Sequence, residues 1–108
     1  MRYLLVCLFL LICNQAFAEK QLWYFTDPQN CPHCVVLERS LRQADLDITT
    51  RAIEVRGQSR ERLNQWGVTA WPTVFLIELS DEGKVTKVYK RHDGSMTPAE
   101  LTKFIQQK

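Results

Sequence analysis

The order of hydrophobic and polar residues predicts four strands along the chain. Residues 21–26 and 73–79 are short runs rich in aromatic and β-branched side chains, which is typical of buried strands. A second strand is predicted at 48–55, which has several apolar residues, and an edge strand at 84–90, where valines alternate with polar neighbours. A Ser-Asp-Glu-Gly turn at 80–83 joins the last two strands as a hairpin.

Three helices are predicted between and after these strands. The first begins at Pro32, and its apolar positions recur at helical spacing as far as Ala44. The second, 59–66, is short and strongly charged, and Gly67 closes it because glycine tolerates the left-handed cap. The third opens at a capping box, 97–100, with proline at the first helical position. The predicted order is therefore β-α-β-α-β-β-α.

The first part of the chain, residues 1–18, has the three-part build of a secretory signal peptide. Arg2 supplies the positive end, and residues 4–13 form an unbroken apolar run. Ala16 and Ala18 are the small residues that such signals carry at positions −3 and −1 of the cleavage site. We therefore expect cleavage after Ala18 and export to the periplasm or the exterior.

Two alternatives to a cleaved signal are weaker. A membrane anchor needs about 20 apolar residues to span a bilayer, and this run is well short of that length. A lipoprotein signal would use Cys13, but the bulky Ile12 stands where such signals have a small residue. The mature protein is thus expected to be residues 19–108, one domain.

Composition and charge exclude several classes of protein. A chain that is 45% hydrophobic and 24% charged is neither disordered nor collagen-like. Its 14 basic and 12 acidic residues are too balanced to indicate a nucleic-acid partner. Signal cleavage removes Cys7 and Cys13 and leaves Cys31 and Cys34, whose disulfide would close too small a ring to stabilise the fold. The remaining pair is therefore expected to serve chemistry.

The motif Cys31-Pro32-His33-Cys34 suits thiol–disulfide exchange. With the helix starting at Pro32, Cys31 lies at its N-terminus, where unpaired N–H groups and the helix dipole stabilise a thiolate. His33, when protonated, adds a positive neighbour. Cys31 would attack a disulfide, and Cys34, one turn along, would resolve the mixed intermediate. We assign these four residues to the catalytic motif.

Metal chemistry is a weaker interpretation of the same residues. Structural zinc needs four ligands, and the mature chain has no second ligand pair at similar spacing, only His33 and His92 besides the cysteines. Haem attachment needs histidine directly after the second cysteine, where Val35 stands. We expect no metal, and no cofactor beyond the Cys31–Cys34 redox disulfide. Two other classes stay open: a module that binds Cu(I) through both thiolates, and a non-enzymatic assembly factor.

Three stretches resemble the thioredoxin superfamily. Residues 25–34, FTDPQNCPHC, resemble the active-site region of the bacterial periplasmic thiol-disulfide oxidoreductases of the Dsb type. Residues 66–73, WGVTAWPT, resemble the loop that ends in a cis-proline, and residues 94–97 resemble the glycine-containing segment beside that loop. The stretches fall in order and span nearly the whole mature chain. The resemblance implies an α/β thioredoxin-like fold with a four-stranded mixed sheet, in which the first two strands are parallel and the third lies antiparallel between the first and the edge strand.

The resemblance also implies a substrate site. Pro72 would be the cis-proline that faces the cysteines and exposes the backbone of Trp71 to an extended substrate segment. The Trp71 side chain is either a groove wall for apolar substrate side chains or part of the core. Ala70 and Gly94 complete the implied substrate-binding residues.

The chain also departs from thioredoxin. Phe25 stands where thioredoxin carries a buried aspartate beneath the cysteines, and Asn30 stands where it has an aromatic residue. The additional N-terminal strand and helix of thioredoxin have no counterpart, nor do the helical insertion of the periplasmic oxidant and the dimerisation domain of the isomerases. We expect a minimal monomer.

The expected substrates are cysteine pairs in other exported proteins, and electrons would pass to or from a membrane or soluble redox partner. His33 and the missing carboxylate favour an oxidant, although a reductase or an isomerase uses the same two sulfurs.

Overall fold

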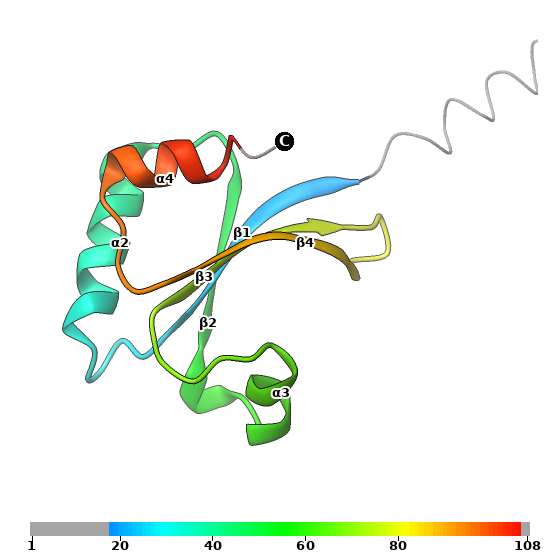
Figure 1. Cartoon of the computed structure of the whole chain (residues 1–108), viewed down its shortest axis with the longest axis horizontal. Coiled ribbons are helices and arrows are strands. Elements are labelled where there is room, and N and C mark those ends of the chain that lie inside the picture. The colour runs from blue at the N-terminus through cyan, green and yellow to red at the C-terminus, as the bar shows by residue number, and fades with distance from the viewer. Residues whose placement is uncertain (1–17, 107–108) are drawn as a thin grey trace, which may run out of the picture.

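The computed structural model describes residues 18–106, which form a four-stranded sheet with helices on both faces (Figure 1). Its elements in chain order are β1 (Glu19–Thr26), α2 (Pro32–Ala44), β2 (Thr49–Glu54), the 3-10 turn η1 (Val55–Gly57), α3 (Arg60–Gln65), β3 (Thr73–Leu79), β4 (Val85–Asp93) and α4 (Pro98–Phe104). The predicted order of strands and helices is confirmed, with η1 added after β2. The predicted signal peptide, apart from Ala18, lies outside the described residues. Within residues 18–106, no helix has the length and apolar character that a membrane crossing requires.

The sheet has the strand order β2-β1-β3-β4. β1 runs parallel to β2 and antiparallel to β3, and β3 runs antiparallel to β4. The predicted mixed sheet is therefore confirmed, including the place of β3 between β1 and the edge. Phe25 lies opposite Thr73, so the loop after β1 and the loop before β3 leave the sheet at the same end.

The ends of three strands differ from the prediction. β4 runs on to Asp93, because its ladder with β3 continues to the pair of Thr73 and Asp93. β2 ends at Glu54, and Val55 instead begins η1 with its side chain buried. β1 begins at Glu19, two residues earlier than predicted, because Glu19 pairs with the last residue of β3. Backbone pairing, rather than the apolar pattern, therefore sets where each of these strands begins or ends.

Alternate side chains of the sheet build two apolar layers. The layer under α2 and α4 is made by Leu22, Tyr24, Leu37, Val74, Leu76, Met96, Leu101 and Phe104. The layer on the α3 side is made by Trp23, Phe25, Val55, Val68, Phe75 and Ile77. Trp66 joins this second layer, with ring centroids 5.0 Å from Phe75 and 5.7 Å from Phe25, an arrangement of aromatic rings that adds to the gain from burial.

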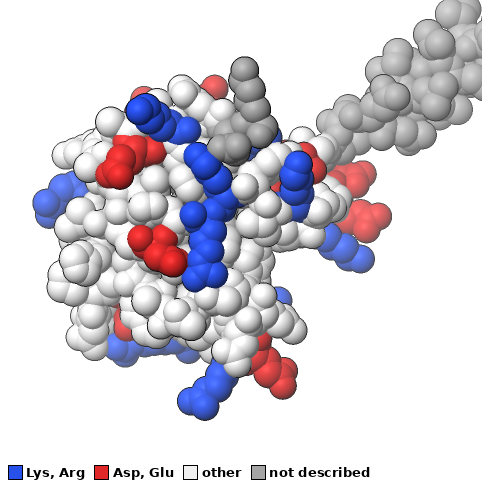
Figure 2. Space-filling model, in the orientation of Figure 1, with Lys and Arg blue, Asp and Glu red and all other residues white. Residues whose placement is uncertain are grey.

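Charged groups lie outside these layers. Lysine and arginine side chains are interspersed with aspartate and glutamate over the face seen in Figure 2, in keeping with the near balance of 14 basic and 12 acidic residues. Such a surface offers no extended field of one sign.

The predicted capping box starts α4. Thr97 Oγ1 accepts a hydrogen bond from the backbone N–H of Glu100 at 3.1 Å, and a Glu100 carboxylate oxygen accepts one from the Thr97 N–H at 2.9 Å. Hydrogen bonding from Thr97 to the Glu100 carboxylate, chiefly from the Thr97 backbone N–H, lowers the pKa of Glu100 below its ordinary value of 4.5. The cap holds α4 so that Leu101 and Phe104 are buried against the sheet.

Replacing Thr97 with alanine should lower the free energy of unfolding by about 1 kcal/mol, because the cap of α4 is lost. Urea unfolding of both proteins measures the difference. Thr102→Ala is the matched control, since the Thr102 hydroxyl donates only to the Pro98 carbonyl within the same helix and such bonds add little. Equal losses in the two variants would contradict the role of the cap.

Candidate active site

The cysteine pair forms a disulfide at the start of α2. The Sγ atoms of Cys31 and Cys34 are bonded, and their Cα atoms lie 5.2 Å apart. Cys31 is the N-cap residue with an extended backbone, and its Sγ accepts a hydrogen bond from the backbone N–H of Cys34 at 3.1 Å. Pro32 takes the first helical position, where a missing N–H costs nothing. One donor of the helix N-terminus thus points at the Cys31 sulfur, where it favours the thiolate once the bond is reduced.

The loop before β3 lies directly against this sulfur. The Trp71–Pro72 peptide bond is cis, as the resemblance implied. The carbonyl oxygen of Trp71 lies 3.6 Å from Sγ of Cys31. In the disulfide this is a contact without a proton, and after reduction the Cys31 thiol can donate to the same oxygen.

Short hydrogen bonds hold this loop in shape. Thr73 Oγ1 donates to the Ala70 carbonyl, and the Gly94 N–H donates to the Pro72 carbonyl, each at 2.8 Å. Gly94 has φ +99°, a conformation that glycine adopts without strain. The structure thus brings Ala70, Trp71, Pro72 and Gly94, all predicted as substrate-binding residues, to one loop cluster beside Cys31.

The two cysteine residues differ in exposure. Cys31 is 7% exposed and Cys34 only 1%, so both are buried and Cys31 is the more exposed of the two. Pro32 and His33 are exposed, and within residues 18–106 the His33 side chain makes no hydrogen bond or ion pair.

Exposed apolar side chains occur on both chain segments of the site. Val35 and Val36 in α2 are exposed by 45% and 44%, and Trp71 on the loop by 38%. The Trp71 side chain is therefore not part of the core.

No carboxylate stands at the position that thioredoxin uses for its buried acid. Phe25 is 1% exposed and packs among aromatic rings. The neighbouring Thr26 is also buried, and its hydroxyl has no hydrogen-bond partner among the described residues. The buried acid of this segment is Asp27, and its carboxylate turns to Arg56 rather than to the sulfurs.

Arg56 is a residue of this region that motif analysis misses. Its Nε donates to Asp27 at 3.1 Å, and Nη1 donates to Gln29 at 2.7 Å. The signal that could reveal it is topological. Because β1 and β2 are parallel neighbours, the residues that follow them emerge side by side, and Arg56 comes two positions after the end of β2.

His92, considered above as an additional metal ligand, lies elsewhere. Its Nε2 is 3.2 Å from the Ser95 carbonyl, and its ring packs edge-on against Phe104. Within residues 18–106, no three His, Cys, Asp or Glu side chains are grouped closely enough to hold a metal ion.

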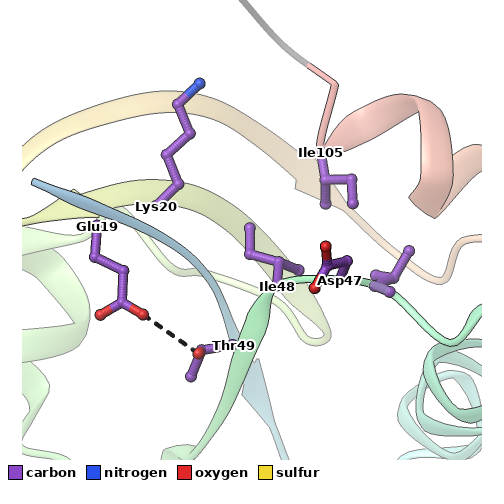
Figure 3. A pocket seen from close by; sticks show the side chains of 7 residues that line it. Glu19, Lys20, Asp47, Ile48, Thr49 and Ile105 are labelled. Atoms are coloured by element: carbon purple, nitrogen blue, oxygen red, sulfur yellow. Dashed lines mark hydrogen bonds between the residues drawn. The ribbon is translucent and has the colours of Figure 1, made fainter.

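A hollow of about 600 Å³ lies at the other end of β1 (Figure 3). Glu19, Lys20, Asp47, Ile48, Thr49 and Ile105 are among its lining residues. Glu19 accepts a weak hydrogen bond from Thr49 across it, at 3.5 Å. Among residues 18–106, no cysteine or histidine lines this hollow. The disulfide follows the other end of β1.

No model of a known protein family matches the sequence, and no curated protein sequence matches it either. Solved structures do match. A thioredoxin-2 described as a component of the malaria parasite protein secretion machinery has a TM-score of 0.67 at 15% identity, over 82% of this chain and 82% of that chain. Chloroplastic thioredoxin z gives 0.64 at 21% identity, over 92% and 84%. Mitochondrial thioredoxin 3 from Saccharomyces cerevisiae gives 0.59 at 25% identity, over 82% and 77%.

These matches cover most of each chain at low sequence identity, so they report the architecture rather than the client or the direction of electron flow. The chain has the thioredoxin fold, with the disulfide-bonded pair Cys31–Cys34 at the N-terminus of α2.

Proposed function

We propose that the protein is an exported thiol–disulfide oxidoreductase that exchanges disulfides with cysteine pairs of other exported proteins. The observation that carries this proposal is the position of the Cys31–Cys34 disulfide. Cys31 caps α2, accepts the Cys34 N–H at 3.1 Å and faces the Trp71 carbonyl at 3.6 Å. A disulfide that closes so short a loop adds little stability, which leaves reactivity as its use.

The exchange proceeds in two steps of sulfur chemistry. In the oxidising direction, a substrate thiolate attacks Sγ of Cys31, the Cys31–Cys34 bond breaks, and Cys34 leaves as a thiolate. A second thiolate of the same substrate then attacks the substrate sulfur that is bonded to Cys31. The substrate disulfide forms, and Cys31 leaves as a thiolate. Two electrons pass from the substrate to the protein, and the substrate gains a disulfide. The reducing direction is the reverse.

Substrate binding uses the loop before β3. The Trp71 backbone faces Cys31 and can pair with an extended segment of the substrate. The exposed side chains of Val35, Val36 and Trp71 provide apolar contacts beside the sulfur. An unfolded or partly folded chain, which exposes apolar side chains near its cysteines, fits such a surface, and a monomer suffices to bind it.

Stabilisation of the Cys31 thiolate favours the oxidising direction. The helix N-terminus and a protonated His33 both favour the Cys31 thiolate and therefore the reduced form. A protein whose reduced form is stabilised gives up its disulfide easily and acts as an oxidant. A membrane or soluble partner must then reoxidise the pair.

Cys31 should be the cysteine that reacts first. In reduced protein at mildly acidic pH, a brief pulse of iodoacetamide should label Cys31 and leave Cys34 protected, because Cys34 is buried and Cys31 faces the helix N-terminus. Peptide mapping by mass spectrometry measures the two yields, with Cys31→Ser as the control. Faster labelling of Cys34 would reverse the assigned roles.

Exchange with an unfolded substrate protein that contains a disulfide should require both sulfurs, because the Cys31 thiolate attacks that disulfide and releases the other substrate sulfur as a thiolate. Cys34→Ser should accumulate a mixed disulfide through Cys31, because no thiol remains to resolve it, and Cys31→Ser should form none. Non-reducing gels and mass spectrometry detect the adduct. If the wild type binds Cu(I) stoichiometrically but exchanges no disulfides, it is a metal-binding module. If a protein that carries both Cys31→Ser and Cys34→Ser retains its cellular role, the chain is an assembly factor.

Replacing His33 with alanine should raise the pKa of the Cys31 thiol and make the reduction potential more negative, since the reduced form loses a stabilising charge. Thiolate absorbance against pH and equilibrium with a glutathione buffer measure the two effects. A change of about 30 mV corresponds to a free-energy change of about 1.4 kcal/mol for this two-electron couple. His92→Ala is the control, because His92 contacts Ser95 and Phe104 instead. Identical values for the wild type and His33→Ala would remove His33 from the mechanism.

A further inference from the structure

Arg56 binds three residues of the loop between β1 and α2 through three different nitrogen atoms. Nε donates to Asp27 Oδ1 at 3.1 Å, and Nη1 donates to Gln29 Oε1 at 2.7 Å. Nη2 donates to the Asn30 side-chain oxygen at 2.8 Å when the amide is oriented so that its nitrogen donates to the Gln29 carbonyl at 3.1 Å. The guanidinium therefore spans the loop almost from end to end.

The strand pairing places Arg56 beside this loop. Thr26 and Glu54 are paired at the ends of the parallel strands β1 and β2, so the segments that follow them leave the sheet together. The Asp27 side chain is 9% exposed and the Arg56 side chain is 50% exposed. A carboxylate so nearly buried needs a partner, and the planar guanidinium supplies one while its other nitrogens reach the neighbouring residues.

The loop also carries hydrogen bonds of its own. Asp27 Oδ1 accepts the backbone N–H of Gln29 at 3.2 Å, which makes an Asx-type turn. Asn30 directly precedes Cys31, so the course of the loop sets the direction from which the chain reaches the N-cap of α2. A lysine at position 56 would keep the charge but could not bond three separate acceptors in this planar arrangement.

Cys31 is therefore held from two sides. The loop before β3 contacts its sulfur through the Trp71 carbonyl, and the Arg56-bound loop fixes its backbone. The geometry points to Arg56 as a positioning residue of the redox site, which keeps the Cys31 sulfur placed for bond formation with Cys34. This inference rests on the proposed function, because it concerns the reactivity of the same cysteine pair.

The step that depends on this placement is ring closure. When glutathione is joined to Cys31 as a mixed disulfide, the Cys34 thiolate attacks the Cys31 sulfur, the Cys31–Cys34 bond forms, and glutathione leaves as a thiolate. The rate of such an intramolecular step depends steeply on the relative position of the two atoms, and an error of about 1 Å can cost about a hundredfold.

The test compares the first-order rate constant of ring closure in Arg56→Lys, Arg56→Gln and wild-type protein. Reduced protein is mixed with oxidised glutathione, quenched with acid at intervals and analysed by mass spectrometry for the mixed and internal disulfides. Both variants should close the ring about tenfold more slowly than the wild type. Arg60→Gln is the matched control. It removes the same charge four positions further on, and within residues 18–106 the Arg60 side chain makes no hydrogen bond or ion pair.

Asn30→Ala removes a single contact of Arg56 and provides a variant that folds if the Arg56 variants do not. It should slow ring closure by a smaller factor. A wild-type rate constant in Arg56→Lys would show that only the charge matters and would overturn the inference. The inference would also be overturned if the Arg56 variants unfold at a lower temperature than the wild type but show the wild-type rate constant of ring closure when it is measured well below that temperature. If wild-type protein closes its own ring but exchanges with no protein substrate, the proposed function fails while the inference stands.

Discussion

The rest of the structure depends on how β1 is paired, with one parallel and one antiparallel neighbour. β1 runs parallel to β2 and antiparallel to β3, so its last residues are paired on both sides. The segments that leave β1 and β2 and the segment that enters β3 therefore meet at one end of the sheet. That end carries Cys31, Trp71 and Arg56, which are distant in the sequence. A slip of either register by one residue would exchange the faces of the strand and separate these groups.

Within this frame, the packing of α2 makes the two sulfurs unequal. Cys34 and Leu37 lie on the buried side of the helix, so the helix can seat on the sheet only with the Cys34 sulfur inside. Cys31 precedes the first helical turn and stays at the rim, where a helix N–H reaches its sulfur. The same apolar burial that stabilises α2 thus leaves Cys34 less exposed than Cys31. Under the proposed function, Cys31 is therefore the cysteine that reacts with the substrate.

Much of this architecture can be predicted from the sequence because it is local. The apolar run of β3, the proline and capping box of α4 and the Cys31–Cys34 spacing each act within a few residues, and all three predict correctly. What the sequence does not predict is decided by pairing between distant segments. β4 continues to Asp93 because β3 offers it a partner there, not because its side chains alternate further. Arg56 is one charged residue among many until the parallel strands bring it to the loop before Cys31.

Phe25 shows how packing limits the chemistry available to this site. Its ring lies 5.7 Å from that of Trp66 and 5.8 Å from that of Phe75, within the aromatic layer on the α3 side of the sheet. A carboxylate at this position would lose much of its hydration among aromatic rings. The only acid nearby in the sequence, Asp27, is already bound by Arg56. Under the proposed function, the proton of Cys34 therefore passes to solvent or to the substrate thiolate. Under the proposed function, proton transfer then takes place at the rim of the sheet, where the N-terminus of α2 favours the thiolate.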